Sequence, residues 1–324
     1  VTVLINLPLN SIAEIKAWPL WDQYGWLFPL ALLVGGFYYV FRKFGKDDKV
    51  VSTTSYYPPE GVDPAMAGFL INDREDTSDI ISLIPHWGSH GLLTIEEIPK
   101  SGLFKSKDTK ISRLKELNEN ASEYEQTIFN GLFGSNDSEI SLRDIKSKVK
   151  GTFIEKILGE NEIELQDGEV LVSSLKNSFY TKMGTAKTKL KEKAQIYYEA
   201  KSKKVKGITM GVLILLTIVL SLIGLFFWGP VAAVAVGVSC IVLLIINTHM
   251  IKRNTKGNQV LSELKGFKQF IKMAEENKLK MLLKEDPAYF ESTMSYALAF
   301  GMFDRWANKF DALNIPPPNW YHSV

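Results

Sequence analysis

The sequence predicts a mainly α membrane protein, with three transmembrane helices, cytoplasmic winged-helix-like α+β modules and a C-terminal helical module. Three observations predict this class. Three apolar segments approach the roughly 20 residues that a helix needs to cross about 30 Å of hydrocarbon. Basic residues gather at one end of each segment, as they do on the cytoplasmic side of membrane proteins. The other segments alternate between helical and strand periodicity, which is typical of small α+β modules.

The two most apolar segments cover residues 207–228 and 231–247, and neither contains an acidic or basic side chain. Gly229-Pro230 separates them, and proline interrupts a helix because it lacks the N–H that a helix interior uses. Two uncharged helices joined by so tight a turn suit a bilayer. The alternative is a buried hairpin in the core of a soluble protein. We predict two transmembrane helices with a very short outer turn.

A third transmembrane helix is predicted at 24–41, where the apolar run is shorter. Trp18 and Trp21 precede it, and aromatic side chains are enriched where a span meets the membrane surface. Arg42 and Lys43 follow it directly. The aromatic start and the basic end favour a span.

Lysine and arginine also predict the orientation. Residues 1–25 contain one lysine, Lys16, whereas 182–206 contain nine, and basic residues also follow the last span. Because basic residues concentrate in cytoplasmic loops, we place the N-terminus outside and both 42–206 and 251–324 inside. The predicted location is the bacterial cytoplasmic (inner) membrane, with several passes and a cytoplasmic C-terminus.

The predicted organisation therefore alternates membrane and soluble segments. Residues 1–23 are the end of an extracytoplasmic β-region and an interfacial segment, and the transmembrane helices are 24–41, 207–228 and 231–247. The cytoplasmic part consists of a winged-helix-like module at 42–120, a second helical module with a basic juxtamembrane helix at 121–206, and a C-terminal helical module with a Pro-rich aromatic tail at 251–324.

The winged-helix-like interpretation of 42–120 depends on the order of its elements. Asp63-Pro64 predicts a helix start, because a capping carboxylate precedes proline at the first helical position. Further helices are predicted at 76–89 (interrupted by Pro85), 121–133, 141–158, 171–179 and 185–198, and strands at 92–98 and 111–117.

The C-terminal segment combines an amphipathic helix at 258–283 with a stiff aromatic tail. Prolines 316–318 hold the tail in an extended conformation of low entropy. Four large side chains are predicted to pack against that helix or a neighbouring module, which makes the tail a clasp: Trp306, Phe310, Trp320 and Tyr321. A docking motif and a free tail are the alternatives.

The basic run before the second span predicts contact with anionic lipid headgroups, at about 1 kcal/mol per lysine near the surface. The lysines concerned are Lys187, Lys191, Lys193, Lys201, Lys203, Lys204 and Lys206. Alternatively they serve topology alone, or bind nucleic acid through a winged-helix module. We expect nucleic acid to be an unlikely partner, because the run adjoins a span.

Little in the sequence points to catalysis or to a cofactor. The only cysteine, Cys240, lies in an apolar run, so neither an intramolecular disulfide nor a cysteine metal site can form. His86 and His90 are four residues apart, which would place them on one helix face, and Glu96 and Glu97 are near in sequence. A metal site needs such side chains to converge. Because Pro85 and Gly88 disfavour a regular helix, we predict surface histidines at a helix end. No nucleotide-binding or serine-hydrolase motif occurs. We predict no cofactor, no metal and no catalytic residue.

Several short motifs are spread along the chain: Phe44-Gly45-Lys46-Asp47, Tyr57-Pro58-Pro59-Glu60-Gly61, Gly91-Leu92-Leu93-Thr94-Ile95-Glu96-Glu97, Ser174-Leu175-Lys176-Asn177-Ser178-Phe179-Tyr180, Gly266-Phe267 and Pro317-Pro318-Asn319-Trp320-Tyr321. Together they resemble the bacterial membrane-protein family catalogued as domain of unknown function 2207. The resemblance implies a signal peptide and an extracytoplasmic β-sandwich before the first span. The family usually has a basic residue at His90, an aromatic residue at Leu92 and a shorter 134–170 segment. The family name assigns no activity.

The sequence thus favours a non-enzymatic scaffold or signal-relay protein that links an outer β-domain to a cytoplasmic protein-binding platform. Its expected partners are membrane lipids, including anionic headgroups, and unidentified proteins; a homo- or hetero-oligomer is left open. The alternatives are a membrane-tethered winged-helix nucleic-acid binder and an enzyme with an unrecognised cytoplasmic site.

Overall fold

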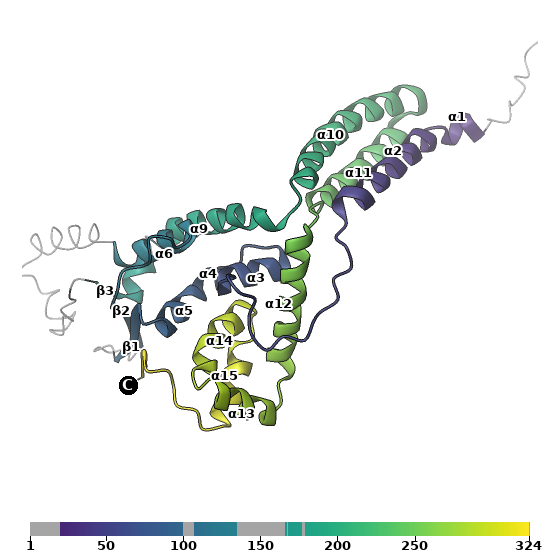
Figure 1. Ribbon diagram of the computed structural model, residues 1–324. Coiled ribbons are helices and arrows are strands. Elements are labelled where there is room, and N and C mark those ends of the chain that lie inside the picture. The colour runs from purple at the N-terminus through teal and green to yellow at the C-terminus, as the bar shows by residue number, and fades with distance from the viewer. Residues whose placement is uncertain (1–19, 100–106, 135–165, 167, 177–178, 324) are drawn as a thin grey trace, which may run out of the picture. The chain divides into compact units, whose positions relative to one another are not determined.

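The structure, a computed structural model, describes residues 20–99, 107–134, 166, 168–176 and 179–323. The chain divides into two compact units (Figure 1). The span unit comprises 1–48 and 198–253, and the sheet unit comprises 49–197 and 254–324. The predicted β-region at the N-terminus and the predicted helix at 141–158 lie outside the described residues.

Among its described residues, the span unit contains three helices that are long and apolar enough to cross a membrane, as the sequence predicts. After the short α1 (Leu20–Tyr24), α2 (Leu27–Val40) continues as a π-helical turn (Phe41–Gly45), and α10 (Ala200–Trp228) and α11 (Pro230–Thr248) follow. Gly229 makes the turn between α10 and α11 with φ of 86°, a left-handed conformation that glycine adopts without strain.

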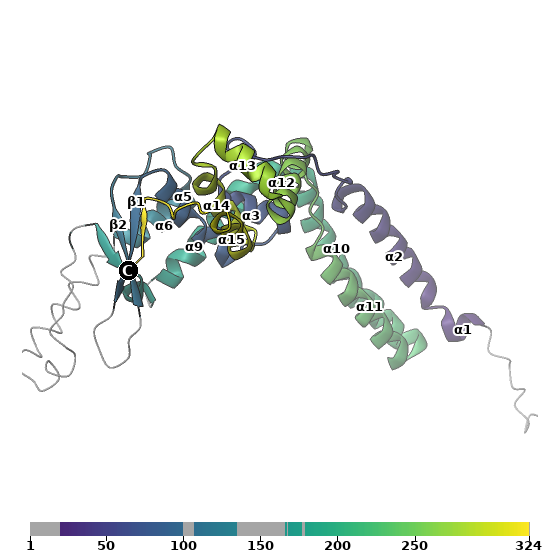
Figure 2. The ribbon, with the colours of Figure 1, turned by 90° about the horizontal axis from the view of Figure 1, so that it is seen from below.

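α10 and α11 pack closely against each other, whereas α2 packs beside them through few side chains. Figure 2 shows α10 and α11 side by side, and Phe37, Leu213 and Leu243 are buried among the three helices. Most of their apolar surface faces outward; only 11% of the most apolar window of α10 is buried. A hairpin in a soluble core would bury that surface, so the exposure favours a bilayer.

The sheet unit begins with three consecutive helices and a hairpin. These are α3 (Pro64–Asn72), α4 (Thr77–Ile81), α5 (Leu83–Ser89), β1 (Leu93–Pro99) and β2 (Lys107–Arg113). The Met66 N–H donates to Asp63 Oδ1 at 3.0 Å, so Asp63 caps α3 as predicted. The predicted interruption at Pro85 is wrong. The break falls at Ser82, because proline is tolerated in the first turn of α5, where N–H groups lack intrahelical partners.

The strands in the described part of the sheet unit form one four-stranded sheet of order β3-β2-β1-β4. β3 (Glu169–Leu171) and a 3₁₀ turn (Val172–Lys176) occupy the region where the sequence predicts a helix at 171–179. β2 lies four residues before the predicted strand at 111–117, because antiparallel pairing with β1 determines its position. The last strand, β4 (Tyr321–His322), pairs in parallel with β1.

The remaining helices form two groups: α6 packs against α9, whereas α14 packs against α3, α4, α5, α13 and α15. They are α6 (Glu123–Phe133), α9 (Phe179–Lys193), a 3₁₀ turn (Ala194–Tyr197), α12 (Thr255–Met273), α13 (Glu276–Glu285), α14 (Tyr289–Ala299) and α15 (Phe303–Asp311). The single helix predicted at 258–283 is thus two helices that meet at Ala274. The core is rich in aromatic side chains; the Phe290 and Phe310 rings, for example, stack at 4.6 Å.

Candidate functional site

Five polar residues form a collar at one end of the three spans: Asp47, Asp48, Ser202, Lys252 and Arg253. The Arg253 side chain is 6% exposed and donates to Asp47 Oδ2. Its main-chain N–H donates to Asp47 Oδ1 at 2.7 Å, and its guanidinium carbon Cζ lies 5.8 Å from the centre of the Tyr198 ring. Asp47 therefore satisfies both a buried charge and a main-chain donor.

Ser202 extends this network to the start of α10. Its buried hydroxyl donates to the Phe44 carbonyl at 2.5 Å and accepts from the Lys252 N–H at 3.0 Å. The collar thus joins three parts of the chain: the segment after α2, the first turn of α10 and the segment after α11.

We expect Asp47→Ala to lower the free energy of unfolding by roughly 2–3 kcal/mol, because it removes the carboxylate that pairs with the buried Arg253 charge. This lies below the usual range for a buried pair, since the Asp47 side chain is 29% exposed. Asp48→Ala is the control. Its carboxylate is 68% exposed and reaches Lys252 at 3.3 Å, so its loss should cost less than about 1 kcal/mol. Equal losses in thermal melts of the two variants would contradict the collar.

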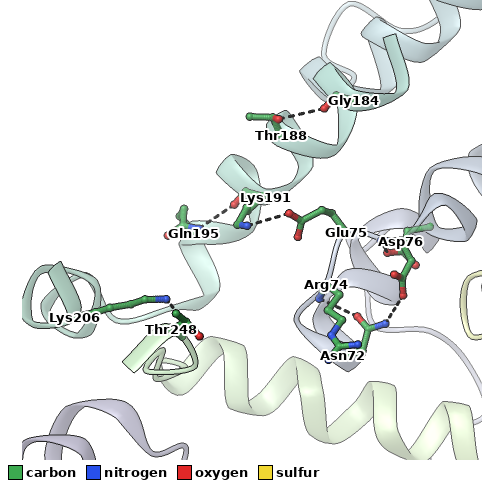
Figure 3. A network of polar contacts seen from close by, with 11 residues as sticks. Asn72, Arg74, Glu75, Asp76, Gly184, Thr188, Lys191, Gln195, Lys206 and Thr248 are labelled. Carbon is green, nitrogen blue, oxygen red and sulfur yellow. Dashed lines mark hydrogen bonds and ion pairs between the residues drawn. The ribbon is translucent and has the colours of Figure 1, made fainter. Parts of the chain in front are cut away.

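The lysines of the basic run fall into two groups. In α9 of the sheet unit, their ammonium groups bind protein acceptors. Lys187 donates to Thr77 Oγ1 at 2.8 Å. Figure 3 shows Lys191, which pairs with Glu75 at 3.0 Å. Lys193 donates to Ser122 Oγ and lies 5.6 Å from the centre of the Tyr124 ring. These three contacts fasten α9 to the start of α4 and to α6.

The second group lies on the first two turns of α10 in the span unit. Lys201, Lys203 and Lys204 are exposed, whereas Lys206 donates to the Thr248 carbonyl at the end of α11 (Figure 3). The first span is likewise followed by basic residues. Among the described residues of the span unit, every lysine and arginine therefore lies at the collar end of the helices.

His86 and His90 lie on one helical turn, with ring centres 4.4 Å apart. Burial lowers the pKa of His86 to about 4, and the charge of His90 acts in the same direction. The nearby acids have other partners, since Glu96 pairs with Lys110 at 2.9 Å and Glu97 accepts from the Tyr321 hydroxyl at 2.5 Å. No group of three metal-binding side chains occurs among the described residues.

Two carboxyl groups of the sheet unit have raised pKa values that the sequence did not predict. Asp63 accepts from the Tyr124 hydroxyl, and burial raises the pKa of both groups. Asp79 is fully buried; its Oδ2 caps α4 by accepting the Asp76 N–H at 2.9 Å, and its Oδ1 has no hydrogen-bond partner among the described residues. Burial raises the pKa of Asp79 to about 7. The spacing Asp76-x-x-Asp79, typical of a capping box at a helix start, is the sequence pattern that could have indicated the role of Asp79.

Ser122 and Lys193 have the residue types of a serine–lysine nucleophile. However, Ser122 is 7% exposed and its side chain caps α6 in a reciprocal pair with Glu125. This hydroxyl is thereby committed to the helix start, which gives the contact a structural explanation.

Asp79 and His86 have opposite effects on the pH dependence of stability. The folded Asp79 keeps its proton up to about pH 7, whereas an unfolded aspartate loses it near 3.9. Stability from this group therefore falls as pH rises between about 4 and 7, by at most about 1.4 kcal/mol per pH unit. His86 stays neutral down to about pH 4 in the folded protein, so its contribution falls as pH decreases below about 6.5.

We therefore expect Asp79→Asn to change the pH profile of thermal unfolding. Relative to the wild type, the variant should gain stability as pH rises from 4 to 7 and show a constant difference above 7. His86→Gln is the matched variant, and its difference from the wild type should change only below about pH 6.5. A profile of Asp79→Asn that runs parallel to the wild type throughout would contradict the buried, protonated carboxyl.

The four aromatic residues of the C-terminal segment occupy two places in the sheet unit. Trp306 and Phe310 are buried in α15, and the Trp306 ring centre lies 6.0 Å from that of Phe270 in α12. Trp320 is 6% exposed and lies against Gly88 of α5, while its carbonyl accepts the Ile95 N–H at 2.7 Å. The end of the tail thus packs on α5 and β1.

Comparison with known proteins places this architecture in a family. Residues 53–310 match the C-terminal domain of a family described as predicted membrane protein (DUF2207). Searches of curated proteins and of solved structures return no match to the chain. The match spans both units and about four fifths of the sequence, so the chain belongs to the DUF2207 family of predicted membrane proteins.

Proposed function

We propose that this protein is a non-enzymatic scaffold or signal-relay protein of the bacterial cytoplasmic membrane, with its N-terminus outside and the sheet unit inside. The observation that carries the proposal is the position of the basic residues. In the described part of the span unit they lie only at the collar end, while the turn at 227–231 carries none. Basic flanks favour the cytoplasmic side of a membrane. Lys201, Lys203 and Lys204 there have free access to anionic headgroups.

The relay role is supported by how the spans continue into the sheet unit. α11 ends at Thr248, and Asn254 caps α12 by accepting the Gly257 N–H at 2.8 Å. Within the sheet unit, the Asn254 N–H also donates to the Tyr197 carbonyl at 3.0 Å, directly before the chain enters α10. Only a short linker joins α11 to α12, so a movement of α11 can be transmitted to α12 through the chain.

The order α3, α4, α5, β1, β2 supports the winged-helix-like interpretation of this part of the sheet unit. A winged-helix protein that reads DNA inserts its recognition helix into the major groove. α5 directly precedes the hairpin and contains no lysine or arginine. A protein-binding platform is therefore the use that we propose for this module, since a fold alone does not determine function.

The scaffold proposal is tested by crosslinking intact cells, purifying the full chain in mild detergent and identifying bound proteins by mass spectrometry. We expect a cytoplasmic protein to co-purify in a fixed ratio and to be crosslinked through residues 49–197 or 254–324. A chain that is crosslinked only to itself and to lipid would contradict the platform.

A further inference from the structure

A cavity of about 450 Å³ in the sheet unit is lined almost entirely by cationic and apolar side chains. It lies where α12 passes the end of α3 and the turn before α15. Its lining residues are Ile71, Lys265, Lys268, Gln269, Lys272, Met273 and Met302. The cavity thus combines three positive charges, one amide and an apolar wall.

The three lysines share one face of α12, because they are three and four residues apart. Among the described residues, none of the three forms an ion pair with a carboxylate within 4 Å. Lysines elsewhere in the sheet unit do so, as Lys191 does with Glu75 at 3.0 Å. Like charges at these spacings destabilise a helix. The arrangement therefore lowers stability as long as no anion is bound.

Lys268 is the least exposed of the three. Its ammonium lies 5.5 Å from the centre of the Phe300 ring, and burial lowers its pKa while the charge of Asp79 opposes that effect. Asp79 is itself buried and keeps its proton up to about pH 7, so it supplies little negative charge under mildly acidic conditions. A partly buried cation without a full counter-charge is a position that an external anion can complete.

We propose that this cavity binds a ligand that carries a phosphate group. Lys265, Lys268 and Lys272 hold the phosphate oxygens, since lysine is a strong point-charge partner for phosphate. Gln269 adds a neutral hydrogen-bond donor, and the apolar wall contacts the rest of the ligand. The phosphate belongs either to a soluble phosphate ester or to a lipid headgroup. The proposal is independent of the scaffold role and of the membrane orientation.

The test uses the full chain in nanodiscs of zwitterionic lipid, with pyrophosphate as the probe and sodium chloride of equal ionic strength as the comparison. Binding to the folded state alone raises the melting temperature with ligand concentration as the site fills. We expect each single Lys→Gln variant at 265, 268 or 272 to weaken pyrophosphate binding about five-fold, and the triple variant to abolish the shift.

The control is the triple variant Lys278→Gln, Lys280→Gln, Lys284→Gln in α13, which changes the net charge equally and should keep the pyrophosphate response. The triple variant of α12 should also melt above the wild type without ligand, because its like-charge repulsion is removed. An equal response of the α12 variant and the wild type, or a wild-type response no larger than that to chloride, would overturn the proposal. The pyrophosphate titration is repeated in nanodiscs that contain phosphatidylglycerol. Weaker pyrophosphate binding would assign the phosphate to a lipid headgroup, and unchanged binding would assign it to a soluble ester.

Discussion

Replacement of Gly266 by alanine should lower the free energy of unfolding of the sheet unit by about 3 kcal/mol or more. An added Cβ on α12 would lie 1.5 Å from the carbonyl oxygen of Thr53, so the two backbones would have to separate. Overpacking of this kind typically costs 1–3 kcal/mol, and a backbone atom cannot move aside as a flexible side chain does. The glycine of the motif Gly266-Phe267 is therefore explained by this close approach.

Separation of the two backbones would also remove polar contacts between α12 and the extended segment at 50–55. The Ser262 hydroxyl donates to the Val51 carbonyl at 2.5 Å, and the Thr53 N–H donates to the Ser262 carbonyl at 3.4 Å. The measurement is denaturation of the full chain in detergent, followed by circular dichroism and by proteolysis after α12.

Gly184→Ala is the matched control for Gly266→Ala. Gly184 lies inside α9, and among the described residues no atom beyond the backbone of its own helix lies within 4 Å of an added Cβ. Alanine in an open helix position should raise stability by about 0.5–1 kcal/mol. Two variants with the same chemical change should thus shift the melting temperature in opposite directions. A neutral Gly266→Ala variant would show that α12 and the 50–55 segment are not in contact.

Trp320→Ala should lower the free energy of unfolding by about 3–4 kcal/mol, the cost of emptying a buried tryptophan site. The side chain is 6% exposed and fills the space that Gly88 leaves open; a Cβ on Gly88 would lie 2.6 Å from its ring. Truncation after Ile315 removes the same ring together with β4. It should expose 258–310 to protease.

Trp320→Phe separates packing from hydrogen bonding at the same position. The indole N–H of Trp320 is buried without a partner among the described residues, and an unsatisfied buried donor carries a desolvation cost. Phenylalanine retains most of the ring contact and removes that donor, so it should recover more than half of the stability that alanine loses. A tail that can be truncated without any change in melting temperature or protease pattern, but with loss of a bound protein, would be a docking motif.

The sequence was sufficient for the features that depend on local composition. Uncharged runs of about 20 residues predict the spans wherever they fold, and Asp63-Pro64 marks a helix start by its own chemistry. The strands were harder, because Lys107–Arg113 contains only one strongly apolar residue, Ile111, and its position depends on pairing with β1. β3 and β4 have three and two residues, too few for a periodic pattern.

The candidate sites depend on contacts between residues far apart in the chain. Asp47 and Arg253 are 206 positions apart, and neither residue alone suggests a buried pair. The lysines at 187, 191 and 193 formed part of an apparently continuous basic run, yet their acceptors lie in α4 and α6. Lys265, Lys268 and Lys272 follow an amphipathic pattern that is common on solvent-exposed helices. The sequence therefore does not reveal the cavity, which is formed by the packing of α12 against its neighbours.

In the orientation that we propose, the collar end of the spans, and with it the sheet unit, faces the cytoplasm. Single cysteines introduced at exposed positions of a Cys240→Ala chain test this directly with a membrane-impermeant thiol reagent in intact spheroplasts. We expect Gln23→Cys to be labelled, and Glu60→Cys and Glu285→Cys to be labelled only after permeabilisation. Labelling of Glu60→Cys and Glu285→Cys in intact spheroplasts, with Gln23→Cys shielded, would reverse the orientation and contradict the account.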